Sequence, residues 1–176
     1  MDIDPKIAAA LGFPRPHYTA VERERRWLCK SVPSSLVRQT LTIADLYVTG
    51  ARLRLREMRP SDGGPGMLRL TRKGDVDPYT RLITSIYLPE EEFAILSAAL
   101  SGARLSKLRH RLHAPAGISM SIDEFQGTLA GLCLLEVEFE TAAELVAFVA
   151  PDFAAAEVTS DVRYTGAWLA TNGLPG

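Results

Sequence analysis

The feature of this sequence that most limits its fold is a repeated alternation of charged and apolar residues with a period of two. Five segments carry it, at 21–28, 51–57, 68–73, 106–112 and 134–140. Successive side chains of a β-strand point to opposite faces, so each segment predicts a strand with one charged face and one apolar or mixed face. The sequence therefore predicts an α+β protein that is mainly β.

The charges on these faces are segregated by sign. Basic faces are predicted for three segments, with Arg52, Arg54 and Arg56 on one, Arg69 and Lys73 on the next, and Lys107, Arg109 and Arg111 on the third. The segment 134–140 is acidic. Like charges opposite one another destabilise a sheet, and a surface suited to solubility mixes signs. Periodicity alone leaves two interpretations open: a solvated face, or a site that binds a polyanion and a cation.

Composition narrows the class of protein. The 176 residues suit a single domain (1–176, with a core at about 18–170), and 47% hydrophobic and 23% charged residues are typical of a globular chain. The net charge of −1 predicts no nucleic-acid or membrane partner. We find no signal-peptide pattern and no long apolar span, so we expect a cytoplasmic protein. Cys29 and Cys133 lack metal-ligand spacing and are expected to be buried thiols.

Turn and helix signals separate the strands. Pro, Gly, Ser and Asp cluster at 59–66, and shorter breaks fall at 75–78 and 114–117, which predicts hairpin connections. Helices are expected at 89–102, where three glutamates follow Pro89, and at 141–150, where Thr141 is the cap. Shorter helices are expected at 4–11 and 166–170.

Short motifs follow the alternating strands in a fixed order. The first is Glu22-x-Glu24-x-Arg26, which is similar to a Glu-x-Glu-x-Lys signature. Further matches lie at 43–48, 53–56, 70–73, 107–109, 122–125, 131–132, 135–139 and 157–164. In this order the motifs resemble the CYTH domain, the triphosphate tunnel metalloenzyme superfamily, over nearly the whole chain.

The resemblance implies a closed eight-stranded antiparallel β-barrel, the triphosphate tunnel, with a few helices packed outside. It also implies that the lumen holds a triphosphate-containing small molecule with one or two Mg²⁺ or Mn²⁺ ions, and that the protein can form a homodimer. Charged residues would then face the lumen, while leucine, valine and phenylalanine meet the covering helices.

The resemblance assigns roles to individual residues. Carboxylates suit hard cations, and the implied metal-side residues are Glu22, Glu24, Glu136 and Glu138. Arginine and lysine bind phosphate oxygens, and the implied substrate-binding residues are Arg54, Arg56, Lys73, Arg81, Lys107 and Arg109. The implied catalytic residues are Glu22, Glu24, Arg26 and Glu138. Arg26 stands where the family usually has lysine, and it cannot donate a proton near neutral pH.

One stretch departs from the family pattern. After Arg81 the family often has alternating glutamates, whereas this chain has Ile83 and Ser85. Asp75 or Asp77 could compensate. The departure leaves the fold inference intact and weakens the inference of activity.

The expected function is metal-assisted hydrolysis of inorganic triphosphate or of a nucleoside triphosphate. Inorganic triphosphate is the simplest substrate because no base-recognition motif is present. The alternatives are a non-catalytic sensor of polyphosphate or nucleotide, and adenylate cyclase (class IV) or thiamine triphosphatase activity on the same fold. No separate general base is evident, since His17, His110 and His113 are expected to be structural or exposed.

Overall fold

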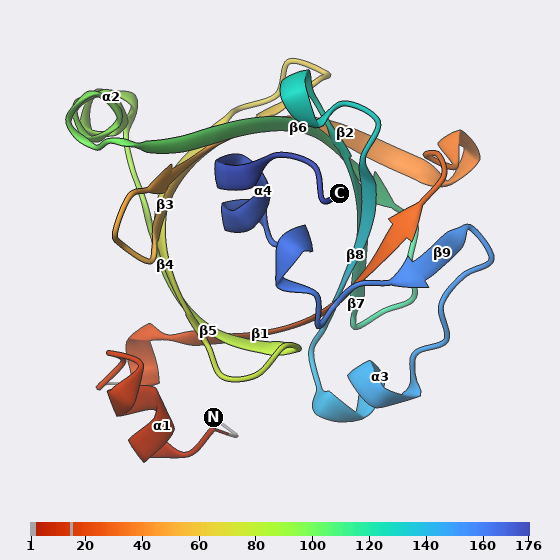
Figure 1. Ribbon diagram of the computed structural model, residues 1–176, viewed down its shortest axis with the longest axis horizontal. Helices are drawn as coiled ribbons and strands as arrows, with labels where there is room; N and C mark the ends of the chain where they lie inside the picture. The colour runs from red at the N-terminus through yellow and green to blue at the C-terminus, as the bar shows by residue number, and fades with distance from the viewer. Residues whose placement is uncertain (1–2, 15) are drawn as a thin grey trace.

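Eight antiparallel strands form a closed barrel in the computed structural model, which describes residues 3–14 and 16–176 (Figure 1). The strands are β1 Ala20–Cys29, β2 Val37–Val48, β3 Leu53–Pro60, β4 Met67–Asp75, β5 Thr80–Tyr87, β6 Gly102–Leu112, β7 Ile118–Phe125 and β8 Cys133–Phe139. Their order is β5-β4-β3-β2-β6-β7-β8-β1. The ring closes where β5 returns to β1, with Ala20 opposite Ile83 and Glu22 opposite Arg81. The predicted eight-stranded barrel is confirmed.

A ninth strand, β9 (Ala154–Glu157), extends the sheet outside the ring. The first part of β1, residues 20–23, pairs with β5, and its last part, residues 27–29, pairs with β9. Since β8 pairs with the other edge of β1 over residues 23–28, every part of β1 has a partner strand on at least one side. The three predicted breaks are the connections between β3 and β4, β4 and β5, and β6 and β7.

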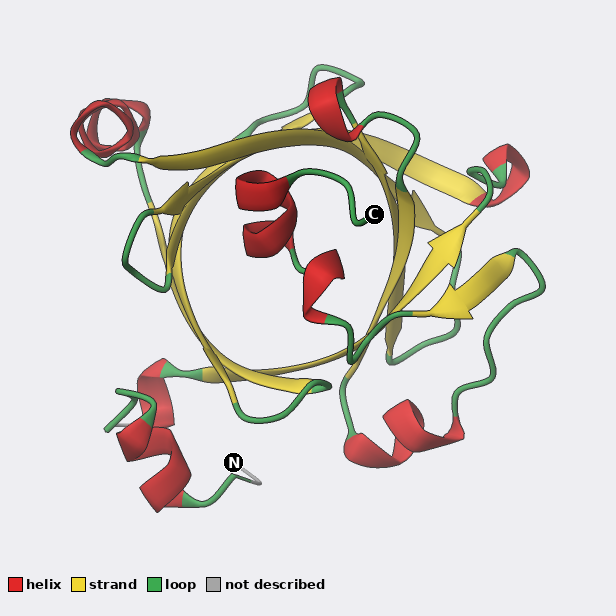
Figure 2. Ribbon diagram, in the orientation of Figure 1, coloured by secondary structure: helices red, strands yellow, loops and turns green. Residues whose placement is uncertain are grey.

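Three short helices lie outside the ring, as Figure 2 shows: α1 (Pro5–Ala10), α2 (Glu90–Ala99) and α3 (Ala142–Ala147). Single turns of 3₁₀-helix are η1 Pro16–Tyr18, η2 Ser34–Leu36, η3 Gly127–Leu129 and η4 Val162–Tyr164. Thr141 caps α3 through a capping box with Glu144. The helix ends earlier than predicted because Phe148 is extended and packs its ring 5.7 Å from Trp27 and 5.2 Å from Phe139.

The helix α4 (Gly166–Asn172) differs from the others because it lies within the ring at one end of the barrel (Figure 1). A helix was predicted here, but the expected position was outside. Leu169 is 1% exposed and belongs to the same buried cluster as Leu105, Phe125 and Leu134. A Cβ at Gly166 would lie 2.0 Å from the Tyr47 hydroxyl, so only glycine allows this close approach. Apolar side chains therefore fill one end of the barrel.

The outer faces of β1, β7 and β8 form a second apolar cluster. Trp27, Ile122, Leu135 and Val137 are buried there, and side chains of α3 and the following loop pack against them. This packing accounts for the apolar half of the alternation in these strands. Within the described ranges, no helix has the length and apolar character needed to cross a membrane.

Candidate functional site in the barrel lumen

Strand register turns the charged faces toward one another inside the barrel. Residues directly opposite in an antiparallel pair share a face, and Glu24 lies opposite Glu138 while Glu22 lies opposite Arg81. On the other side of β5, Ile83 lies opposite Lys73. The acidic residues of β1 and β8 and the basic residues of β4 and β5 therefore line one lumen.

Three carboxylates converge in this lumen. One oxygen each from Glu22, Glu24 and Glu138 lies within 4.8 Å of the others. Lys73 Nζ lies 2.5 Å from Glu22 Oε2, and Arg81 Nη1 lies 2.5 Å from Glu24 Oε1. No hydrogen bond or ion pair among the described residues reaches the Glu138 side chain.

The electrostatics of this group fit a divalent cation. Burial, and after it the negative charge of Glu22, raise the pKa of Glu138. Burial acts to raise the pKa of Glu22 as well, but the charge and hydrogen bond of Lys73, together with the charges of Arg81 and Arg54, outweigh it and lower the pKa. A set of carboxylate oxygens with negative charge left uncompensated is the ligand chemistry that Mg²⁺ and Mn²⁺ prefer.

Glu136, the fourth residue that the resemblance implied as a metal ligand, lies apart from this group. Its carboxylate accepts a hydrogen bond from Arg109 Nη2. Against the effect of burial, the charges of Arg109 and Lys107 hold its pKa well below the usual range. The structure therefore places Glu136 among the basic residues, where it orients Arg109.

On the basic side of the lumen, Arg54 and Arg56 share one buried aspartate. Asp45 is 2% exposed and accepts two hydrogen bonds from Arg56, at 2.6 and 2.7 Å. Arg54 Nε lies 3.8 Å from the same carboxylate. A bidentate pair of this kind fixes the plane of the Arg56 guanidinium.

A second buried aspartate organises β6 in the same way. Asp123 is fully buried and accepts hydrogen bonds from Lys107 and from Arg109, whose Nε lies 2.6 Å away. Sequence reasoning quoted Asp45 and Asp123 in the motifs but gave them no role. For both aspartates the sequence offered one signal, which is a single acid on the inward face of a mostly apolar strand that neighbours a basic strand.

The two residues that depart from the family pattern, Ile83 and Ser85, lie on β5. Ile83 supplies no ligand atom, and the Ser85 hydroxyl lies 2.8 Å from the Thr71 hydroxyl. Asp75 accepts a hydrogen bond from Arg81 Nε at 3.0 Å and another from Arg52 at 2.7 Å. It compensates the charge of Arg81 without joining the three carboxylates.

Arg26 lies at the apolar end of the lumen and binds backbone. Its guanidinium donates to the carbonyl of Tyr164 at 2.7 Å and to that of Thr159 at 3.0 Å. Its Nε lies 3.4 Å from Glu24. The side chain therefore ties the C-terminal segment to β1 and supports Glu24.

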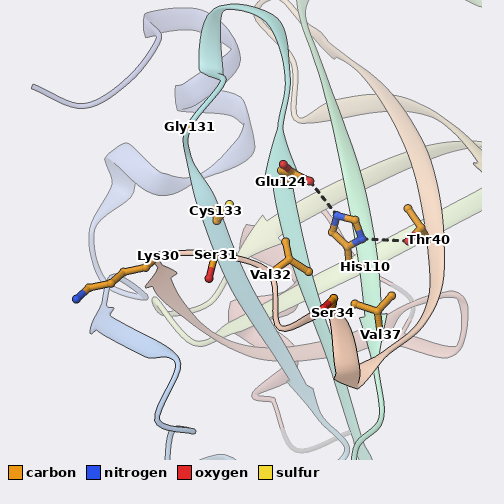
Figure 3. A pocket seen from close by; sticks show the side chains of 10 residues that line it. All are labelled: Lys30, Ser31, Val32, Ser34, Val37, Thr40, His110, Glu124, Gly131 and Cys133. Atoms are coloured by element: carbon orange, nitrogen blue, oxygen red, sulfur yellow. Dashed lines mark hydrogen bonds and ion pairs between the residues drawn. The ribbon is translucent and has the colours of Figure 1, made fainter.

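A separate cavity of about 670 Å³ lies on the outer side of β6 (Figure 3). His110 points into it, because it alternates with the inward-facing Arg109. Its Nδ1 lies 3.0 Å from Thr40 and its Nε2 3.1 Å from Glu124, so both ring nitrogens have partners. Cys133 also lines the cavity, and burial raises the pKa of its thiol. These contacts suit a structural histidine.

Comparison with known proteins identifies relatives of this chain in sequence and in structure. No protein-family model matches the sequence. It is 30% identical over 153 residues to an inorganic triphosphatase of Nitrosomonas europaea, covering 85% of this chain and 96% of that protein. The crystal structure of the inorganic triphosphatase NE1496 matches with a TM-score of 0.58 and 28% identity, covering 88% of this chain and 97% of that one.

A more distant structure shares the fold. That of PH1819 from Pyrococcus horikoshii OT3 matches with a TM-score of 0.56 and 20% identity, covering 71% of this chain and 82% of that one. The closed barrel, the charged lumen and the relative at 30% identity agree. The chain belongs to the CYTH family of triphosphate tunnel metalloenzymes.

Proposed function

We propose that the protein hydrolyses inorganic triphosphate with a divalent cation held by Glu22, Glu24 and Glu138. The observation that carries the proposal is the convergence of these three carboxylates within 4.8 Å in a lumen that is also lined by arginine and lysine side chains. The relative at 30% identity is an inorganic triphosphatase, which supports the same reaction class. A bound Mg²⁺ or Mn²⁺ would polarise phosphoryl oxygens and lower the pKa of a coordinated water.

The basic residues would bind the phosphate oxygens and neutralise charge that develops on the leaving group. Arg54, Arg56, Lys107 and Arg109 are held in place by buried Asp45 and Asp123, which leaves little reorganisation for the moment of reaction. Lys73 and Arg81 lie between the acids and these arginines. They are positioned to contact the phosphoryl group next to the cation.

The closed end of the barrel favours a substrate without a bulky organic group. Leu169 of α4 packs there with Leu105, Phe125 and Leu134. An organic group entering that end would have to displace this apolar cluster. Inorganic triphosphate has no such group, so we expect it to be turned over faster than ATP or thiamine triphosphate.

Phosphate release from the three substrates, with Mg²⁺, Mn²⁺ or EDTA, tests the proposal. Glu138→Gln should lower turnover by about 100-fold or more, the size of effect seen when one electrostatic group of an active site is removed. Glu140→Gln is the matched control, because Glu140 follows β8 and is exposed. Equal turnover by Glu138→Gln and wild type would contradict the metal assignment.

A non-catalytic sensor of polyphosphate is the second candidate. Ile83 and Ser85 favour it, since β5 supplies no acid to the metal side. Calorimetric titration with tripolyphosphate separates the two functions. Tight binding that is lost in Arg54→Ala, together with no turnover of any of the three substrates, would identify a sensor.

A further inference from the structure

Arg69 lies directly opposite Arg56 across the β3–β4 pair, on the lumen side of the sheet. It shares its face of β4 with Thr71 and Lys73, and its partner on β5 is Tyr87. Like charges directly opposite in a sheet destabilise it. The arrangement therefore needs either a carboxylate between the two arginines or an anion from outside the chain.

The described residues supply no carboxylate for Arg69. Arg56 is paired with Asp45, Arg81 with Glu24, and no ion pair with an acid is formed by Arg69. Its Nε is buried without a hydrogen-bond partner. Burial, and then the charges of Arg56 and Arg54, lower the pKa of Arg69 to about 10. A buried donor without an acceptor is costly, so this geometry suits a site whose acceptor is a ligand.

We propose that Arg69 is a further substrate-binding residue, which completes with Arg54 and Arg56 a subsite for an unesterified phosphoryl group of a linear polyphosphate. The Nε of Arg54 is also buried, and no described residue accepts a hydrogen bond from it, so two donors of the subsite are unsatisfied within the described part of the chain. The identity of the ligand as substrate rests on the proposed function. The anion-binding role itself rests on the three arginines.

The position of the subsite along β4 separates it from the carboxylates. Arg69 precedes Lys73 by four residues, or about 13 Å along a strand. Lys73 contacts Glu22, so Arg69 serves the phosphoryl group farther from the cation. We therefore expect Arg69 to affect substrate affinity more than the chemical step.

The subsite also bears on substrate class. The end of an inorganic polyphosphate carries more negative charge than a phosphoryl group esterified to a nucleoside. Arg54, Arg56 and Arg69 supply three positive charges, whereas the Asp45 carboxylate is shared by Arg54 and Arg56 only. The subsite therefore favours the more negatively charged end of the polyphosphate. Arg69 should therefore raise the preference for tripolyphosphate over ATP.

Arg72 is the matched control. It lies on the same strand but faces outward, where its guanidinium sits 4.6 Å from the centre of the Phe13 ring. Its Nη1 is also buried without a hydrogen-bond partner. The two arginines thus differ mainly in which face of β4 they occupy.

Thermal unfolding in EDTA, with and without tripolyphosphate, compares Arg69→Met with Arg72→Met. Without ligand, the Tm of Arg69→Met should equal or exceed that of wild type, because an uncompensated cation is removed. The stabilisation by tripolyphosphate should shrink. Arg72→Met should have a lower Tm and keep the full stabilisation by ligand.

Affinity and kinetics complete the test. Arg69→Met should weaken tripolyphosphate binding in a calorimetric titration by about tenfold or more, as expected for a lost hydrogen bond to a charged group. KM should rise by a similar factor with a smaller change in kcat, and the preference over ATP should fall. Arg69→Lys, which keeps the charge, should recover part of the affinity.

Unchanged affinity in Arg69→Met would overturn the inference, and so would a loss of Tm without ligand or a failure to fold. The proposed function fails separately: wild-type protein that binds tripolyphosphate without hydrolysing it contradicts hydrolysis, and the affinity of Arg69→Met still decides the role of Arg69. Wild-type protein that binds no tripolyphosphate contradicts both.

Discussion

Glu24 on β1 and Glu138 on β8 lie directly opposite each other across a strand pair, so two carboxylates share one point of the lumen wall. Glu24 is 6% exposed, which limits screening by water. Such a pair destabilises the sheet unless a cation lies between the oxygens. Of these two carboxylates, Glu24 has ion pairs with Arg81 and Arg26, and Glu138 has none among the described residues, so Glu138 is the carboxylate that most needs a bound metal.

Glu138→Gln should make the protein more stable in EDTA at pH 7. The pKa of Glu138 is raised above 4.5 by burial and by neighbouring carboxylates. The folded state therefore binds the proton more tightly than the unfolded state, and stability falls as pH rises through the raised pKa. The gain in Tm should vanish in acid, where wild-type Glu138 is also neutral.

Addition of Mn²⁺ supplies the second half of that test. Wild-type Tm should rise with Mn²⁺, and the rise should be lost or much reduced in Glu138→Gln. Exposed Glu140→Gln should behave as wild type in both conditions. A lower Tm for Glu138→Gln in EDTA at pH 7 would show that Glu138 supports the fold instead of a cation.

Asp45→Asn should destabilise the protein by about 3–5 kcal/mol at pH 7, because it leaves buried Arg56 without its partner. Although burial opposes it, the charges of Arg56 and Arg54 hold the pKa of Asp45 well below its usual 3.8. A depressed pKa contributes stability above the unfolded pKa, and that contribution is lost as pH falls toward the folded value.

Urea unfolding between pH 3 and pH 7 measures the effect of Asp45→Asn. The difference from wild type should be full at pH 7 and shrink below about pH 4. Exposed Asp152→Asn is the control and should change little. A difference that stays constant with pH would mean that packing, and not charge, makes Asp45 important.

The alternation in the sequence predicted much of the lumen. It placed Glu22 and Glu24 on one face, and Arg54 and Arg56 on another, because side-chain direction follows directly from the period of a strand. The closure of the ring could not follow from alternation. It depends on the pairing of β1 with β5, and only the family resemblance implied it.

Contacts between strands explain what sequence reasoning missed. Glu136 and Glu138 point to the same face of β8, yet Arg109 reaches Glu136, and no ion pair among the described residues reaches Glu138. That difference depends on the register of β6, β7 and β8 and on side-chain length. The position of α4 was missed for a similar reason, since a seven-residue helix does not reveal which surface covers it.

Gly166→Ala should displace α4 from the end of the barrel. The added Cβ would lie 2.0 Å from the hydroxyl oxygen of Tyr47 and 2.8 Å from its Cζ atom. Overpacking of this kind costs about 1–3 kcal/mol. Urea unfolding should show the loss, and a Tyr47→Phe background should reduce it, because the hydroxyl is removed while the ring remains. Equal losses in the two backgrounds would contradict the close contact.

Arg26→Lys tests why this chain has arginine at the third position of its first motif. The two terminal nitrogens of Arg26 bridge the carbonyls of Thr159 and Tyr164, and the single ammonium of lysine cannot reproduce that fork. Loss of one such hydrogen bond should speed amide exchange in residues 159–172 by about tenfold or more.

Amide exchange followed by mass spectrometry, with exposed Arg38→Lys as the control, measures this effect. Faster exchange confined to the C-terminal segment, with the strands β2–β7 unchanged, is the expected pattern. Because Arg26 also lies 3.4 Å from Glu24, Arg26→Lys should in addition lower the turnover of triphosphate. Unchanged exchange with reduced turnover would instead indicate that Arg26 acts on the substrate, since its bridge to the C-terminal segment would then be dispensable.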